Sequence, residues 1–123
     1  MTDQTPETFE VVEVTFGAAP GLAVRGEVDL AAVPALEQAL EAAIKATTGA
    51  LVVDLSEVAF LDSSGLLVLL HGRALLAREN RALAIVCPAG PVRDLFDVAG
   101  VAELLILYAS REDLEAAIGA RRR

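Results

Sequence analysis

The chain has 123 residues, of which 54% are hydrophobic, and a formal net charge of −8. This length fits one domain with its own core, and the apolar content argues against disorder. The acidic balance opposes direct nucleic-acid binding, which needs a basic face to neutralise phosphates. No apolar run approaches the roughly 18 residues of a membrane helix, so we expect no membrane insertion. The single cysteine, Cys87, allows no internal disulfide and fits the reducing cytoplasm.

The first elements are predicted from alternation and from turn residues. Residues 1–8 are expected to form a flexible polar arm. Residues 9–16 alternate apolar and polar side chains, as a half-buried strand does. Residues 17–21 contain Gly and Pro and predict a turn. Residues 22–28 form a second strand, antiparallel to the first because the link is short.

A helix is predicted over residues 30–48, where apolar side chains recur every three or four positions. Pro34 suits its first turn, where the missing N–H does no harm. Gly49 ends the helix. Residues 50–55 are apolar on both sides, so they predict a third, central strand.

A polar turn is predicted to follow and to end at Asp62, before a second helix over residues 66–78. That helix is nearly all apolar at its start and should be the most buried one. Strands are predicted over residues 82–87 and 104–108. A short helix between them begins at Pro91 and ends before Gly100, and a last helix is capped by Ser110.

This order predicts an α/β fold with a single mixed β-sheet, in which an antiparallel first hairpin is followed by parallel strands, packed with four helices. The domain should cover residues 9–119, and residues 120–123 should be a solvated basic tail. Aromatic residues are few, so the largest core side chains are expected to be Phe16, Phe60 and Phe96.

Ser63 and Ser64 stand where the polar turn meets the second helix. The first N–H groups of a helix have no internal partner, so a serine here has two interpretations. It caps the helix through its hydroxyl. Alternatively it carries a phosphate, whose charge of about −1.5 to −2 is favoured by the free N–H groups and the helix dipole. A partner docked over that position would sense the phosphate without any change of fold.

Catalytic residues are hard to find in this sequence. The only histidine, His71, lies about 11 Å of helical rise from Ser63, and no Cys or His cluster has metal-ligand spacing. We therefore expect no enzyme activity, no metal and no cofactor. Asp29 follows the second strand and is either a turn cap or a functional residue. Cys87 ends a buried strand and is interpreted as a small core residue.

Three segments resemble the STAS domain of bacterial anti-sigma factor antagonists. The first covers residues 54–66 and contains the run FLDSSGL. The second is the sequence GEVD of residues 26–29, at the end of the second predicted strand. The third is the helical segment of residues 91–101, which includes the glycine that stops it. With the matching element order, the resemblance covers about residues 9–119.

The resemblance implies that the unphosphorylated protein binds an anti-sigma factor, a serine kinase with an ATP-binding fold, and frees its sigma factor. The kinase would then phosphorylate Ser63, with Ser64 as the weaker candidate, and the complex would weaken. A PP2C-type phosphatase would reverse the step. The partner-binding residues that it implies are Asp29, Asp62, Ser63, Ser64, Gly65 and Leu67.

Leu67 departs from the family pattern D-[ST]-[ST]-G-L-G, which has a glycine at that position. It motivates an alternative, a non-phosphorylated STAS scaffold in a signalling assembly or transporter complex. A third hypothesis is a small enzyme with Ser63 as its nucleophile, for which the sequence supplies no convincing base. We expect a monomer or a weak dimer.

Overall fold

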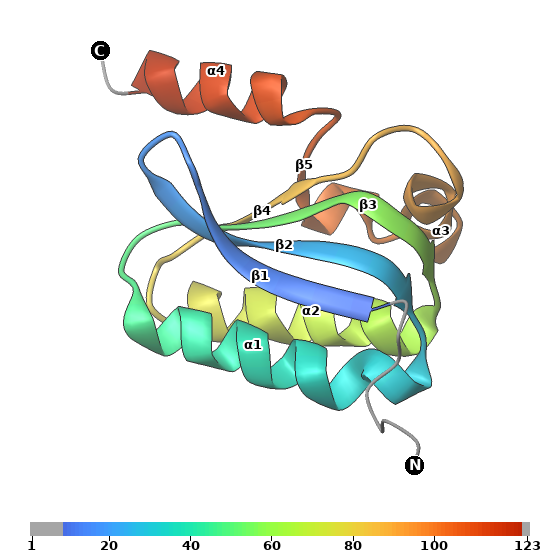
Figure 1. Cartoon of the computed structure of the whole chain (residues 1–123). Coiled ribbons are helices and arrows are strands. Elements are labelled where there is room, and N and C mark those ends of the chain that lie inside the picture. Colours follow the sequence, from blue (N-terminus) through green and yellow to red (C-terminus); the bar gives the residue numbers. More distant parts are fainter. Residues whose placement is uncertain (1–8, 122–123) are drawn as a thin grey trace.

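The computed structural model describes residues 9–121, and Figure 1 shows them as one sheet with helices on both of its faces. The predicted arm of residues 1–8 and the last two residues of the predicted tail lie outside this range. The strands are β1 (Phe9–Phe16), β2 (Ala19–Val28), β3 (Leu51–Leu61), β4 (Leu83–Val86) and β5 (Ile106–Tyr108). The helices are α1 (Val33–Ala46), α2 (Ser63–Ala77), α3 (Pro91–Ala99) and α4 (Arg111–Arg121), with short 3-10 turns η1 (Leu30–Ala32) and η2 (Ala102–Leu104).

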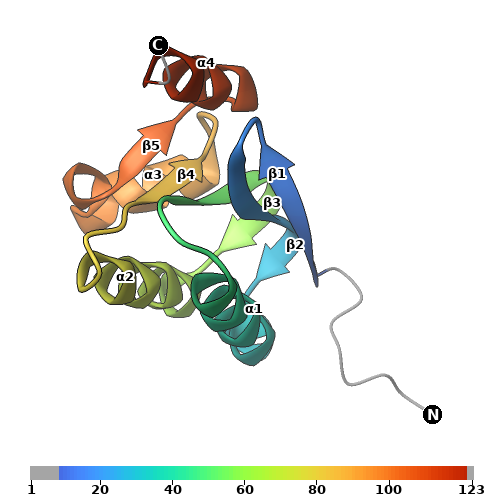
Figure 2. The ribbon, with the colours of Figure 1, turned by 90° about the vertical axis from the view of Figure 1, so that its left-hand side faces the viewer.

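The five strands lie in the order β1-β2-β3-β4-β5. β1 pairs with β2 antiparallel, and the other neighbours are parallel. This confirms the predicted α/β fold with one mixed sheet and four helices. Because each parallel strand lies beside its predecessor, the crossover helices α1 and α2 fall on the same face of the sheet (Figure 2).

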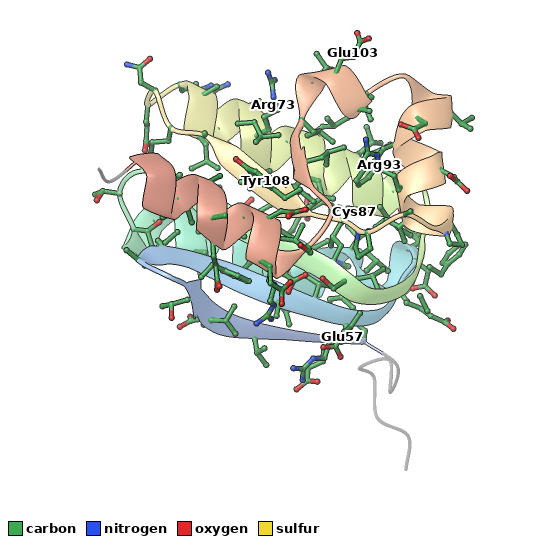
Figure 3. The ribbon with its side chains drawn as sticks, turned by 90° about the horizontal axis from the view of Figure 1, so that it is seen from above. Glu57, Arg73, Cys87, Arg93, Glu103 and Tyr108 are labelled. Carbon is green, nitrogen blue, oxygen red and sulfur yellow. The ribbon has the colours of Figure 1, made fainter. Side chains whose placement is uncertain are left out.

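The sheet has a hydrophobic core on each face. The larger core lies between the sheet and α1, α2 and α3, and Leu36, Leu69 and Phe96 are among its fully buried side chains. The smaller core lies under α4, around Phe16 and Leu114. Figure 3 shows α4 crossing one part of the upper face, with Glu57 outside the part that α4 crosses. The same view places Cys87 near the centre, between Arg93 and Tyr108.

The predicted polar turn over residues 56–62 is wrong, because β3 continues to Leu61. β2 runs alongside it and supplies backbone partners, from Arg25 opposite Glu57 to Val28 opposite Leu61, with two register shifts on the way. A sequence pattern cannot reveal such pairing, since the bulges break the two-residue alternation.

The expectation that Phe60 is a core residue is also wrong, whereas Phe16 and Phe96 are fully buried as predicted. Phe60 is 48% exposed. Neighbouring side chains of a strand point to opposite faces, and Leu61 takes the core-facing position.

Several predicted boundaries shift where a tertiary contact replaces a local signal. The first turn shrinks to Gly17 and Ala18, so β2 begins at Ala19. α1 begins only after η1 and ends at Ala46, before the predicted residue 48. Arg81 explains this early end, because its guanidinium donates to the carbonyls of Ile44 and Gly49 at 2.9 and 2.8 Å. The side chain of Arg81 thus stabilises the C-terminus of a helix that lies 35 residues earlier.

The second half of the chain has similar differences. α2 begins at Ser63, three residues before the predicted Leu66. β5 begins at Ile106, because η2 occupies the first predicted strand residue. Two predicted features are confirmed: Ser110 accepts from the N–H of Asp113 at 3.0 Å, and α3 ends at Gly100.

Helix α4 is held to the sheet by an ion pair that the sequence did not indicate. The Arg111 Nε lies 2.6 Å from Oδ2 of Asp54, a β3 carboxylate that is only 3% exposed. Ser56 donates its N–H and its hydroxyl to the other carboxylate oxygen. The Arg111 guanidinium also lies 4.9 Å from the centre of the Phe16 ring. This buried carboxylate is therefore fully paired.

We predict that Arg111→Ala lowers the free energy of unfolding by about 1–3 kcal/mol, because it leaves a charged oxygen of Asp54 without its partner. Urea denaturation monitored by circular dichroism measures the loss. Arg73→Ala, which removes an exposed arginine from α2, is the matched control and should change little. Equal stability of both variants would show that solvent replaces Arg111 without cost.

Candidate functional site

The candidate site lies where β2 and β3 end side by side. Val28 is the register partner of Leu61, and each is the last residue of its strand. The N–H of Asp62 donates to the carbonyl of Val28 at 3.2 Å, so the pairing extends past the strand ends. An aspartate, Asp29 or Asp62, follows each strand, and the structure therefore brings these two predicted site residues to the same edge of the sheet.

Asp62 is the N-cap of α2. Its Oδ1 accepts from the N–H groups of Ser64 and Gly65 at 3.0 and 3.2 Å, and also from the Ser64 hydroxyl. The hydrogen bond from that hydroxyl, together with those from the backbone N–H groups, lowers the pKa of Asp62 below its usual 3.8. Of the two interpretations of the serines, the one in which a serine caps this helix is wrong, since Asp62 is the cap.

Asp29 repeats this geometry on the neighbouring strand. It is the N-cap of η1, and its side chain accepts from the N–H of Ala32 at 3.3 Å. Its backbone angles, φ −104° and ψ −173°, nearly equal those of Asp62, φ −101° and ψ −176°. Of the two interpretations of Asp29, capping is thus observed, while a contact with a partner stays a prediction.

The two serines differ in what their hydroxyls do. Ser64 is half-buried, and its hydroxyl is engaged by Asp62. Ser63 is the first residue of α2 and is exposed. None of the hydrogen bonds between described residues uses the Ser63 hydroxyl. Ser63 is therefore the hydroxyl that a second protein can reach.

Gly65 lets α2 begin so close to the strand ends. A Cβ there would lie 2.6 Å from Cδ1 of Leu61 and 2.8 Å from Cγ1 of Val28. Gly65 is itself buried, so its observed role is packing. The predicted partner contact at Gly65 stays a prediction.

Two exposed leucines border the site. Leu67 lies one helical turn after Ser63 and is 65% exposed. Leu30 follows Asp29 directly, is 72% exposed, and belongs to η1, which contacts α2. Leu30 is not identified as a site residue from the sequence, although it stands beside Asp29, because there it is only the first residue of the predicted helix over residues 30–48.

Residues for catalysis or metal binding are not assembled here. Within residues 9–121, no group of three His, Cys, Asp or Glu side chains could hold a metal ion. His71 is exposed on α2, two turns beyond Ser63. Burial raises the pKa of the Cys87 thiol to about 11, so it is not a nucleophile at neutral pH. None of the helices in the described range is long and apolar enough to cross a bilayer.

A family model described as "Mlab, STAS domain" matches residues 13–107. The chain belongs to the STAS domain family. This confirms the resemblance carried by residues 26–29, 54–66 and 91–101. Curated proteins gave no match to the chain.

Solved structures place this STAS domain beside anti-sigma factor antagonists. One from Mycobacterium paratuberculosis is 30% identical and superposes with a TM-score of 0.81 over 96% of this chain and 97% of that one. The antagonist SpoIIAA in its unphosphorylated form is 21% identical, with a TM-score of 0.70 over 90% of this chain and 96% of that one. Bacillus SpoIIAA in its phosphorylated form is 20% identical, with a TM-score of 0.62 over 89% and 98%. The two SpoIIAA structures support the fold alone.

We predict that Asp62→Ala lowers the free energy of unfolding by about 1 kcal/mol at pH 7, through loss of the helix cap. Because the folded pKa of Asp62 is lowered, its contribution is complete above the unfolded value near 3.8 and is lost as the pH falls through the folded value. The difference in the free energy of unfolding between wild type and variant should therefore become smaller below about pH 4. Urea denaturation at pH 7 and at pH 3 measures this difference.

The control for this comparison is Glu41→Ala, which removes an exposed carboxylate in the middle of α1. Its effect should be small at both pH values. If Asp62→Ala were as stable as Glu41→Ala at pH 7, the cap would contribute nothing to stability.

Proposed function

We propose that this STAS domain is an anti-sigma factor antagonist whose binding is switched by phosphorylation of Ser63. The observation that carries the proposal is the exposed Ser63 hydroxyl at the N-terminus of α2, directly after the Asp62 cap. In its unphosphorylated form the protein binds an anti-sigma factor that is a serine kinase, and the sigma factor is freed. Phosphorylation weakens the complex, and a PP2C-type phosphatase restores it.

Chemistry at the site supports Ser63 over Ser64 as the modified residue. A kinase must reach the hydroxyl, and the Ser64 hydroxyl is held by the Asp62 carboxylate. The N-terminus of a helix tolerates negative charge, so a phosphate on Ser63 leaves the fold in place. The added charge instead acts on the docked partner.

Asp29, Asp62 and Leu67 are proposed to form the contact surface around Ser63. The two carboxylates lie at neighbouring strand ends, and Leu67 presents an apolar side chain on the same side of α2 as Ser63. The protein's net charge of −8 favours a partner with a basic patch, which would speed association. We propose that the protein acts in the cytoplasm, as a monomer or weak dimer, without catalytic activity of its own.

Leu67 also favours a second candidate function. Position 67 carries a large exposed leucine, where the family pattern D-[ST]-[ST]-G-L-G has glycine. This side chain prevents a partner from approaching α2 closely unless the partner has space to accept it. The protein would then be a non-phosphorylated STAS scaffold in a signalling assembly or a transporter complex. Affinity purification distinguishes the two, because the scaffold would recover a transporter subunit and the antagonist a kinase.

The switch is tested by incubating the protein with each candidate anti-sigma kinase and ATP, and mapping the modified residue by mass spectrometry. We expect phosphate on Ser63 in the wild type and in Ser64→Ala, and none in Ser63→Ala. Modification of a distant residue, or of none with any candidate kinase, would refute the proposal.

Binding should follow the charge at position 63. Ser63→Ala is expected to bind the kinase whether or not ATP is present. Ser63→Asp should bind about tenfold more weakly, since it carries a charge into the contact at a cost of about 1.4 kcal/mol. Isothermal titration calorimetry measures both affinities. Wild-type affinity in both variants would leave Ser63 without a regulatory role.

A further inference from the structure

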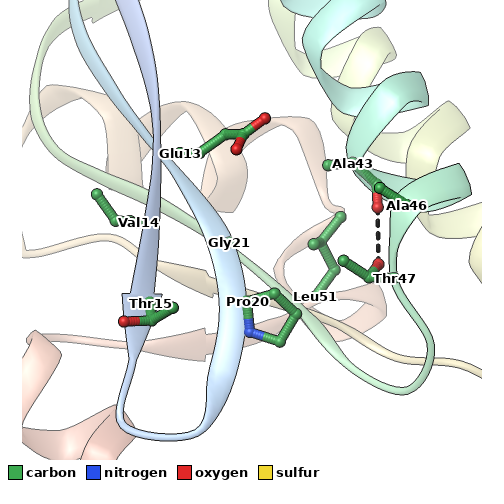
Figure 4. A pocket seen from close by; sticks show the side chains of 9 residues that line it. All are labelled: Glu13, Val14, Thr15, Pro20, Gly21, Ala43, Ala46, Thr47 and Leu51. Carbon is green, nitrogen blue, oxygen red and sulfur yellow. Dashed lines mark hydrogen bonds between the residues drawn. The ribbon is translucent and has the colours of Figure 1, made fainter.

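A hollow of about 460 Å³ lies at the other end of the sheet from Ser63. It opens between the β1–β2 hairpin and the C-terminal part of α1, close to the first residue of β3 (Figure 4). Ser63 follows the last residue of β3, so the length of that strand separates the two sites. This hollow therefore belongs neither to the candidate switch nor to the surface around it.

The hollow exists because the hairpin extends beyond the end of the helix that covers it. α1 ends at Ala46, where Arg81 and Thr47 take up carbonyls of its last turn. The helix residues that face the hairpin here, Ala43 and Ala46, are too small to reach it. No bulky side chain fills the space, which lies within the range of about 300–1,000 Å³ typical of small-molecule sites.

The lining combines apolar walls with one negative charge. Pro20, Leu51 and the two alanines provide the apolar surface. Figure 4 shows Glu13 extending from β1 into the gap toward α1, while Val14 points to the other side of the hairpin. No described basic side chain lies within ion-pair distance of Glu13, in contrast to Glu10 on the same strand, which pairs with Arg25 at 3.5 Å.

We propose that this hollow binds a small organic cation, an ammonium group joined to an apolar body. Among the described residues that line the hollow, Glu13 is the only charged one, and none of the ion pairs between described residues involves it. An anion would be repelled by this carboxylate, and a neutral ligand would leave it unused. The apolar body fills the space beside Ala43 and Ala46.

Nuclear magnetic resonance titration with three matched probes tests the proposal: 4-phenylbutylammonium, 4-phenylbutanol and 4-phenylbutanoate. The ammonium is expected to shift the amide resonances of Thr15, Ala43 and Leu51, and to bind about two- to fivefold more tightly than the alcohol, as an exposed charge pair allows. The carboxylate should bind more weakly than the alcohol, by a similar factor. Equal binding of the ammonium and the alcohol, or shifts confined to residues around Ser63, would overturn the proposal.

Two variants with matched controls locate the site. Glu13→Gln should remove the preference for the ammonium over the alcohol, whereas Glu41→Gln, an exposed position on α1 outside the lining, should retain it. Ala46→Leu should fill the hollow and abolish the shifts for both probes. Ala42→Leu, at an exposed helix position that does not line the hollow, should not. Unchanged binding in Ala46→Leu would place the probes elsewhere and refute the assignment.

Discussion

The parallel pairing of β2 with β3 runs to the last residue of both strands, and the candidate site depends on it. Val28 lies opposite Leu61, and the Asp62 N–H continues the ladder by donating to the Val28 carbonyl. The two neighbouring strands therefore end side by side at the same edge of the sheet, and an aspartate follows each of them. Gly65 keeps the space between α2 and these strand ends free of a side chain.

The polar side chains of the site differ in whether they are hydrogen-bonded within the protein or left exposed. The Ser64 hydroxyl donates to Asp62, and Asp62 caps the first N–H groups of α2, so both side chains stabilise the start of that helix. Ser63 is left exposed beside them. A phosphate on Ser63 would lie next to the ionised Asp62, whose repulsion offsets part of the favourable dipole contribution of about 0.3–1 kcal/mol. The added charge would therefore be presented to a partner rather than absorbed by the helix.

The two faces of the sheet are stabilised in different ways. On the lower face, α1 and α2 pack closely enough that a Cβ on Gly72 would lie 2.5 Å from the Leu40 side chain. On the upper face, α4 covers a smaller core and is fixed by the ion pair from Arg111 to the buried Asp54. The hollow beside Glu13 lies between the β1–β2 hairpin and the C-terminal part of α1. The hollow and the candidate site around Ser63 thus lie at opposite ends of the sheet.

Local chemistry in the sequence was enough to predict the order of the elements, the mixed sheet and the position of Ser63. Alternation in β1, the apolar run that begins β3 and the Ser110 cap are signals carried by neighbouring residues, so no distant contact was needed to read them. The family segments added a partner-binding role for the two aspartates, which the turn chemistry had already singled out. Leu30 was not identified, because the sequence marks it only as the first residue of a predicted helix.

Only the tertiary structure decided how far β3 extends, which residues end α1 and which side chain pairs with the buried Asp54. These features depend on partners far along the chain: β2 lengthens β3, Arg81 ends α1, and Arg111 neutralises Asp54. Phe60 is exposed for the same reason, since the register set by β2 turns Leu61 inward. A hydrophobic pattern reports what one segment prefers, whereas pairing register and ion pairs depend on which segments meet in space.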